Sequence, residues 1–353
     1  MAGGTWENTN KPVLPGLYMN FQAAAASAIQ GGSRGTVIVP VKANWGPVGT
    51  FVEIGSETAI EQIFSAGTED GATAYSTLYL ALLGGPRKLL AYRLADDTAA
   101  KAAVKLKNGD AEDVLELTAL YSGSRGNRFT VTVQPSIDNN AVKEVLLYEG
   151  TKLLKTFTAE SATAEAVAAA INEDSENKWV TAKALAAAEE LANITGAGLT
   201  GGISGNSQLA NADYIAMQEA LEGEDFNVLA LDYAADMALL QSFAAWIKRV
   251  RNQGKGVVAV FGGSAAEDVS ANAVQAASAR SLALNHEGII NVGTGVRLAG
   301  VEYSSAQTAA YVAGLIAGQR LNQSTTYAVT PFEDVTRRWT RPEQEQAVRN
   351  GVF

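Results

Sequence analysis

The feature that most constrains the fold of this chain is a regular alternation of apolar strands and helical patterns after residue 206. Short apolar runs occur at 227–232, 257–261 and 289–292, and amphipathic stretches separate them. Strands that alternate with helices in this way pair in parallel through right-handed crossovers. Residues 33–95 show the same alternation, so we expect the two stretches to form one α/β core.

A helix is predicted over 304–318, because Ser304 and Gln307 have capping-box spacing. Its small side chains recur at helical spacing, which indicates close packing against another element. We expect Gly318 to end this helix in a left-handed turn and 325–329 to follow as a strand. Another capping box, at Ser264 and Glu267, predicts a long helix that ends near Asn285.

The middle of the chain has a different pattern, typical of hairpins and a small β-sandwich. Its expected strands cover 114–121, 129–135, 144–148, 152–157 and 179–184. Residues 196–205 contain five glycines and are interpreted as a hinge or linker. We therefore predict an α/β fold with a split Rossmann-like core, an inserted β-sandwich-like domain and an N-terminal extended arm. The boundaries are 1–32 for the arm, 33–99 with 206–353 for the core, and 100–205 for the insert.

Composition excludes several kinds of chemistry. The 353 residues include no cysteine and one histidine, which excludes disulfides and most zinc sites. His286 is expected to meet carbonyl groups at a helix end. A net charge of −10 argues against nucleic acid as a partner, and no apolar run is long enough to insert in a membrane. We expect no catalytic residue, no metal and no cofactor.

One partial motif leaves a different function open. Gly262, Gly263 and Ser264 follow a strand and begin a helix, which is where an α/β sheet binds phosphate. The turn lacks the Walker lysine spacing and the full dinucleotide fingerprint. The alternative hypothesis is a nucleotide-binding protein or enzyme that uses this turn. Asp232 and Asp236 are interpreted as a turn residue and a helix cap in preference to metal ligands.

The two ends of the chain contain the candidate contact residues. The arm has an apolar strand pattern at 13–21, which either folds back or adds to a sheet in another subunit. Its apolar side chains are Val13, Leu14, Leu17, Tyr18, Met19 and Phe21. Arg337, Arg338 and Arg341 form a basic patch, either a solvated face or a docking contact. Because a new strand pattern begins at Val352, we expect the natural protein to continue beyond Phe353.

Four blocks in order resemble contractile tail sheath proteins of bacteriophages, defective prophages and phage-tail-like bacteriocins. They are KPVLPGLYMNF (11–21), KANWGP (42–47), YSGSRGN (121–127), and AAYVAGLIAG (309–318) with its sequel NQSTTY. Each block is weak alone, but their combined order is specific, and the resemblance covers nearly the whole chain.

The resemblance implies a structural subunit without enzymatic activity. Sheath subunits stack as a helical sleeve around an inner tail tube, between baseplate and tail terminator proteins, and the sleeve contracts to drive the tube through the target envelope. Arms at both ends link neighbouring subunits by adding strands, and 13–21 matches the N-terminal arm. The implied location is the virion tail sheath, assembled in the bacterial host cytoplasm. A secretion-system sheath is a further reading of the same resemblance.

Overall fold

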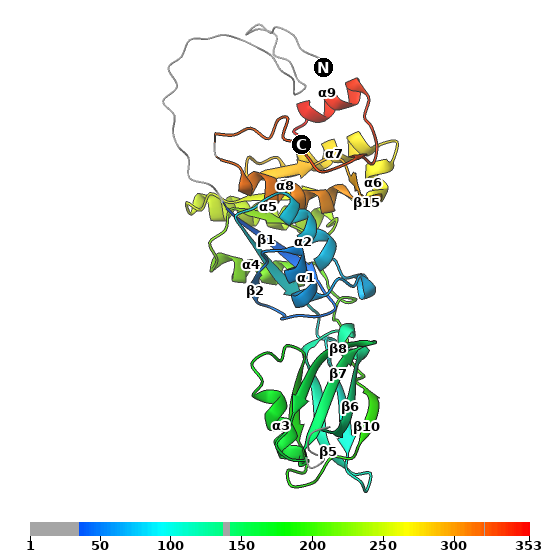
Figure 1. The fold of residues 1–353 in the computed structure, drawn as a ribbon. Helices are drawn as coiled ribbons and strands as arrows, with labels where there is room; N and C mark the ends of the chain where they lie inside the picture. Colours follow the sequence, from blue (N-terminus) through cyan, green and yellow to red (C-terminus); the bar gives the residue numbers. More distant parts are fainter. Residues whose placement is uncertain (1–34, 137–141, 321) are drawn as a thin grey trace.

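The computed structural model describes residues 35–136, 142–320 and 322–353. Two lobes lie end to end (Figure 1). The upper lobe contains the α/β elements and both ends of the described chain, and the lower lobe contains the β-rich middle of the sequence. The arm predicted at 13–21 lies outside the described residues.

The upper lobe is built on a six-stranded sheet in the order β13-β12-β11-β1-β3-β2. Every neighbouring pair is parallel except β2 with β3. The strands are β1 (Thr36–Lys42), β2 (Phe51–Glu53), β3 (Lys88–Leu94), β11 (Val228–Ala230), β12 (Val258–Gly262) and β13 (Ile289–Val292). Strands from before and after the middle region therefore share one sheet, as the alternation predicted.

Helices cover both faces of this sheet, because its strands are apolar on both sides. Val37, Val39 and Val41 of β1 pack with α2 and α8, and Ile38 packs on the opposite face with α4 and α5. The helices are α1 (Glu57–Phe64), α2 (Ala74–Leu83), α4 (Asn211–Glu222), α5 (Met237–Asn252), α6 (Ala265–Val269), α7 (Ala273–Leu284), α8 (Ser305–Gly318) and α9 (Arg341–Arg349).

Helices α8 and α2 approach closely because glycines line their contact. A Cβ at Gly314 would collide with the Ala81 carbonyl oxygen, and one at Gly84 would collide with the backbone of α8. The capping box of α8 is confirmed, with the Ser304 hydroxyl accepting the Gln307 N–H. The predicted left-handed turn at Gly318 is wrong, since α8 leads directly into extended backbone at Gln319 (φ −81°). Gly318 is instead required by close approach to Gly85.

The lower lobe consists of two sheets around their own apolar core. Their orders are β10-β6-β7-β8 and β4-β5-β9, and α3 (Ala164–Asn172) packs beside them. The strands are β4 (Lys101–Lys107), β5 (Asp113–Ser122), β6 (Phe129–Pro135), β7 (Lys143–Glu149), β8 (Lys152–Thr158), β9 (Val180–Ala184) and β10 (Ile194–Gly198). Strands β4 and β10 were missed, because lysines and glycines hide their alternation.

Two other local predictions are wrong. The long helix expected over 264–285 is two helices, because Ser270 after α6 is extended (ψ 158°). Residues 325–329 form no strand but a bend, a short turn and irregular backbone. The strands of this region are β14 (Val296–Leu298), β15 (Val301–Tyr303) and β16 (Asp334–Val335). They form a small sheet in the order β15-β14-β16. Both errors come from local propensity that tertiary packing overrides.

The α2–α8 contact predicts a specific cost for Gly314→Ala. Alanine is the better helix former by about 1 kcal/mol, but its methyl group meets a rigid backbone carbonyl, and overpacking of this kind costs about 1–3 kcal/mol. We expect a net loss of up to about 2 kcal/mol in the free energy of unfolding, measured with urea. Gly109→Ala is the control, because a Cβ there meets open space. Equal stability of the two variants would contradict the close approach.

Candidate functional site

The strand order of the central sheet reverses between β1 and β11, where open α/β sheets bind ligands. Asp232 lies there, 1% exposed, just after β11. Its carboxylate accepts hydrogen bonds from the Thr73 hydroxyl and from the Tyr214 hydroxyl (2.9 Å). Burial raises the pKa of Asp232 above its ordinary value, against the opposing effects of the Thr73 hydrogen bond and the Lys42 charge. The protein's own side chains thus occupy this position.

The two aspartates interpreted as turn and cap have different roles. Asp236 is the N-cap of α5, and its carboxylate accepts the Leu239 N–H at 2.8 Å, which confirms the cap. Asp232 is instead the buried acceptor between β11 and the helices. From sequence alone, a polar residue at the end of a strand predicts a turn. Only the order of the strands shows that Asp232 lies where that order reverses.

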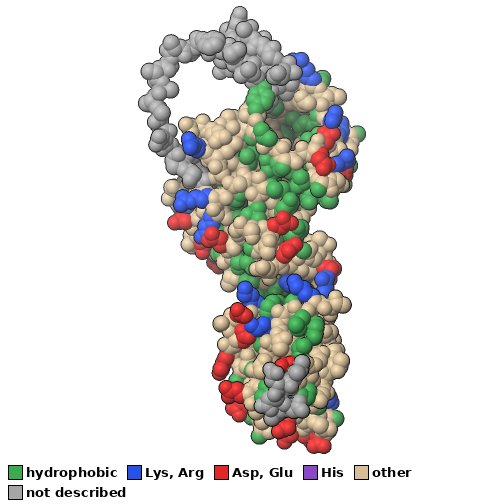
Figure 2. Space-filling view, in the orientation of Figure 1, with side chains coloured by type: hydrophobic (Ala, Val, Ile, Leu, Met, Phe, Trp, Pro, Cys, Tyr) green, Lys and Arg blue, Asp and Glu red, His purple; other side chains and the backbone are tan. Residues whose placement is uncertain are grey.

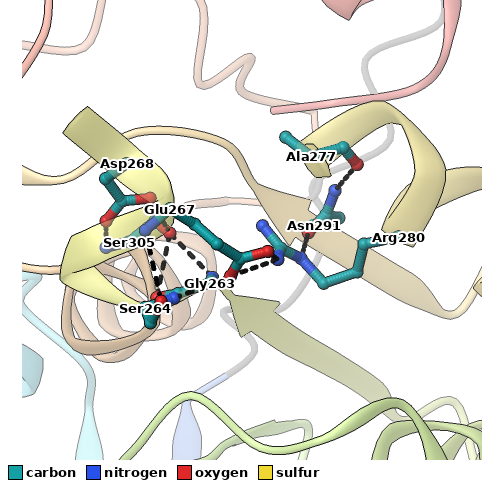
Figure 3. Close-up of polar contacts among 8 residues, drawn as sticks. All are labelled: Gly263, Ser264, Glu267, Asp268, Ala277, Arg280, Asn291 and Ser305. Atoms are coloured by element: carbon teal, nitrogen blue, oxygen red, sulfur yellow. Dashed lines mark hydrogen bonds and ion pairs between the residues drawn. The ribbon is translucent and has the colours of Figure 1, made fainter. Parts of the chain in front are cut away.

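The Gly262–Ser264 turn is also filled from within (Figure 3). The Gly263 N–H donates to the Ser305 hydroxyl at 2.7 Å. The Ser264 N–H donates to the Glu267 carboxylate at 3.0 Å, and that carboxylate also faces Arg280. The capping box at Ser264 is therefore confirmed. The amides that would bind a phosphate already have partners, and a carboxylate lies beside them, so a nucleotide site is not favoured.

The rest of the buried network in Figure 3 is structural as well. Asp268 accepts the Ser305 N–H at 2.5 Å and the Ser305 hydroxyl at 2.7 Å, which joins α6 to the start of α8. Arg280 donates to the Asn291 side chain at 2.7 Å, and Asn291 donates to the Ala277 carbonyl at 2.8 Å. The bonds of Asn291 fasten α7 to the edge strand β13.

Neither metal nor membrane chemistry has support in the described part of the chain. Residues 35–136, 142–320 and 322–353 contain no group of three or more His, Asp or Glu side chains placed to hold a metal ion. None of their helices is long and apolar enough to cross a bilayer. His286 accepts the Gly288 N–H through Nδ1 at 3.0 Å, so its ring stabilises the turn after α7. The expected contact was with carbonyl groups, whereas the observed one is with an N–H group.

The arginines of the predicted basic patch all have local partners. Arg337 pairs with Glu343 at 2.7 Å, Arg338 with Asp334 at 2.8 Å and Arg341 with Glu345 at 3.2 Å. The Arg338 and Arg341 side chains remain 82% and 74% exposed, whereas Arg337 is 25% exposed. Their charge is therefore largely neutralised where it stands, and two of the three remain available at the surface.

An apolar groove of about 380 Å³ lies between α8 and the small three-stranded sheet. Figure 2 shows hydrophobic side chains gathered on this face of the upper lobe. The groove is lined mainly by Val292, Val296, Tyr311, Val312, Leu315 and Phe332. Asp334 is the carboxylate in its lining, and it is paired with Arg338. The groove offers an apolar contact surface and no catalytic constellation.

The two lobes meet at Arg93, near the end of β3, whose side chain is completely buried. Its guanidinium donates to the carbonyls of Gly46 (2.6 Å), Ser122 (2.9 Å) and Ser204 (3.0 Å). Gly46 belongs to the upper lobe, whereas Ser122 and Ser204 lie where the lower lobe adjoins it. Burial lowers the pKa of Arg93 to about 10, so the group stays charged at neutral pH. One cation thus joins three separate backbone segments.

Trp45 reinforces this junction from the upper lobe. It follows β1, is 1% exposed and packs within the apolar core of the lower lobe. Its ring meets Tyr121 and Phe129 edge-on at centroid distances of 5.4 and 5.3 Å. The Arg125 guanidinium lies 5.9 Å from the same ring and pairs with Glu149 at 2.8 Å. The lobes therefore share a side chain as well as a polar clamp.

The glycine segment 196–205 is not a free hinge. Its first part belongs to β10, and Thr200 and Ile203 make bridges to the β4 side of the lobe. The Asn127 side chain bonds both backbone groups of Gly202 at 2.8 Å. A Cβ at Gly202 would collide with the Gly123 carbonyl. The glycines permit close backbone packing at the junction, which composition cannot distinguish from flexibility.

Comparison with known proteins agrees with this architecture. Residues 95–206 match the model of the phage tail sheath protein β-sandwich domain, and residues 207–353 match that of its central domain. The crystal structure of the sheath tail protein from Desulfitobacterium hafniense is 31% identical in sequence with a TM-score of 0.72. The match covers 96% of this chain and 71% of that one. The chain belongs to the phage tail sheath family.

Two further relatives support the assignment. The sheath tail protein of Listeria innocua has a TM-score of 0.70 at 29% identity, with 91% of this chain and 65% of that one covered. The XkdK protein of the phage-like element PBSX of Bacillus subtilis is 30% identical over 339 residues. The match spans 93% of this chain and 66% of that relative's length.

Two of the four blocks that carried the resemblance lie side by side in the structure. Blocks 42–47 and 121–127 meet at the junction, where a Cβ at Gly123 (φ +143°) would collide with the Asn44 carbonyl. Block 309–318 is the core of α8. Arg93 was missed, although a cation inside the apolar part of the strand KLLAYRL is the available signal. Such a residue needs buried acceptors, and the sequence does not show which carbonyls supply them.

Replacing the junction cation should loosen the sheath protein at one defined place. In Arg93→Met, the carbonyls of Gly46, Ser122 and Ser204 lose this donor, and each group left unsatisfied in a buried place costs about 1–3 kcal/mol. Relief of the buried charge offsets part of this cost, so we expect a net loss of at least about 2 kcal/mol. Thermal unfolding measures it. The control is Arg338→Met, whose exposed ion pair is worth at most about 1 kcal/mol; an equal effect would contradict the clamp.

The contacts at the start of α9 make the stability of this helix depend on pH. Glu343 accepts the Thr340 N–H and pairs with Arg337, and these contacts lower its pKa from 4.5 to about 2. A carboxyl group whose pKa is lower in the folded protein than in the unfolded chain stabilises the folded state at pH values above its unfolded pKa. This stabilisation is lost as the pH falls through the pKa of the folded state. We expect α9 to loosen between pH 4.5 and about 2. Amide exchange in α9 would test this, with Glu343→Gln removing most of the dependence.

Proposed function

We propose that this sheath protein polymerises into a helical sleeve around an inner tail tube, and that the sleeve contracts to drive the tube through the target cell envelope. The observation that supports it best is the match of two consecutive sheath domains over residues 95–353. Closure of the crevice at Asp232 and of the turn at Gly263 favours a structural role over an enzymatic one. The family itself is one of structural proteins.

The proposed partners are proteins. They are other copies of the chain, the inner tube protein, and baseplate and tail terminator proteins, without nucleic acid or membrane insertion. The proposed place is the tail sheath of a virion or a related particle assembled in the host cytoplasm. The net charge of −10 supports the exclusion of nucleic acid. Isolating the particle from its host would distinguish a phage, a bacteriocin and a secretion system.

Two contact sites are part of the proposal. The arm residues at 13–21 would add a strand to a neighbouring subunit, because an apolar strand pattern suits backbone pairing with another chain. Arg338 and Arg341 would meet an acidic partner, because they are the exposed members of the basic patch. Arg337 would support them by its link to the α9 cap.

We further infer that 33–99 and 206–353 fold as one split Rossmann-like core, with 100–205 inserted and 1–32 as an arm. The parallel pairing of β1 with β11 supports a single core, and the separate apolar cluster supports a distinct insert. In that case Arg93→Met should separate the unfolding of the two lobes into distinguishable steps. An unchanged single transition in a destabilised variant would contradict the division.

Removing residues 1–22 from the native protein tests assembly through the arm. We expect the native protein to form tubes by electron microscopy, and the shortened protein to remain as folded, unassembled subunits, because the linking strand is gone. Circular dichroism controls for folding. Tubes of normal length from the shortened protein would overturn the role of the arm, and native subunits that never assemble would overturn the sheath proposal.

The nucleotide alternative has its own test. A thermal-shift series with ATP, GTP, NAD and inorganic phosphate should leave the melting temperature unchanged, because the Gly263 and Ser264 amides are already bonded. A saturable increase that Ser264→Ala does not alter would point to binding elsewhere. An increase abolished by that variant would revive the alternative function.

A further inference from the structure

The lower lobe is closed on one side by backbone pairing. The Ala103 N–H donates to the Thr200 carbonyl at 2.9 Å, and the Thr200 N–H donates to the Ala103 carbonyl at 3.0 Å. These bonds join β4 to the chain that follows β10. On the other side, β8 and β9 end their sheets, with no further strand beside them in the described residues. Such edges carry free N–H and C=O groups that pair readily with another chain.

The outer edge of β9 is already occupied by two side-chain amides. The Asn172 amide donates to the Ala182 carbonyl at 2.8 Å, and its oxygen accepts the Ala182 N–H at 2.9 Å. The Asn177 amide bonds Val180 in the same way, at 2.7 Å to the carbonyl and 3.3 Å from the N–H. An asparagine amide has the donor and acceptor of a peptide group. Each therefore occupies the place of a peptide from a neighbouring strand.

The segment that carries these amides is anchored across the open side. Val167 and Ile171 of α3 are buried in the apolar core of the lobe, which fixes the helix end at Asn172. Asp174 and Glu176 then pair with Lys155 of β8 at 3.0 and 2.7 Å. The segment thus bonds the edge of one sheet and a side chain of the other. Its position follows from packing and charge together.

We propose that residues 172–177 are an edge cover that closes β9 to strand addition by a second copy of the chain. The second copy's β9 is the expected partner, since equivalent edges pair about a two-fold axis. The backbone groups of Val180 and Ala182 are the site, and Asn172 and Asn177 hold it shut. The proposal concerns the insert alone and does not rest on the sheath function.

The test is the double variant Asn172→Ala with Asn177→Ala in the full chain. Light scattering coupled to size exclusion should detect dimers or larger species that increase with concentration, while the unaltered chain lacks this β9-mediated association. In the monomer fraction, the Ala182 amide should exchange about fivefold faster, which is the factor that corresponds to one lost hydrogen bond of about 1 kcal/mol. Asn193→Ala is the matched control, since that exposed side chain bonds only Lys143 among the described contacts.

Three results would overturn the proposal. One is a folded double variant that associates no more than the Asn193→Ala control at high concentration. Another needs no variant: the Ala182 amide of the unaltered chain exchanging as fast as an exposed amide. If the double variant does not fold, the single variants Asn172→Ala and Asn177→Ala provide the association test. If the variant associated through another surface, its Ala182 amide would exchange as fast in the dimer as in the monomer. That result would equally contradict pairing through β9.

Discussion

The structure depends on the three carbonyl bonds of Arg93, because the chain leaves the six-stranded sheet for the β-sandwich domain and returns to it at one place. The chain leaves after β3 and returns before β11, two strands that flank β1. The Asp96 N–H donates to the Gly205 carbonyl at 2.7 Å, so the outgoing and returning chains are in contact. A buried cation among carbonyls holds this crossing without a rigid covalent link. Its hydrogen bonds to three backbone segments offset the free-energy cost of burying its charge.

Internal hydrogen bonds also close the two places where an α/β sheet binds small molecules. An α/β sheet offers ligands its carboxyl edge and the amides at its helix starts. Here Asp232 is bonded to Thr73 and Tyr214, and the Gly263 amide is bonded to Ser305. Both sets of bonds join elements distant in sequence. Groups that would bind a small molecule in an enzyme instead fasten the core.

Local rules predicted the core because its signals are local. Capping boxes at Ser264 and Ser304, and the apolar strands beside them, could be found from spacing alone. The errors arose where contacts with residues distant in sequence decide the local structure. Strand β10 exists because β6 pairs with it despite its glycines, and the site at Arg93 depends on carbonyls from three segments. A sequence shows that a buried arginine needs acceptors but not which loops bring them.

An assembly linked through backbone pairing faces a problem of specificity, since a peptide edge does not distinguish its partners. Charge on edge strands discourages wrong pairing, and Lys155 of β8 fits that role through its bonds to Asp174 and Glu176. Strand β9 carries the stronger device, because the Asn172 and Asn177 amides satisfy the peptide groups themselves. If the arm at 13–21 is the linking strand, it needs one open receiving edge and closed edges elsewhere. In that case the covered edge of β9 would help to set the choice of partner, together with the edge that is free to receive the arm.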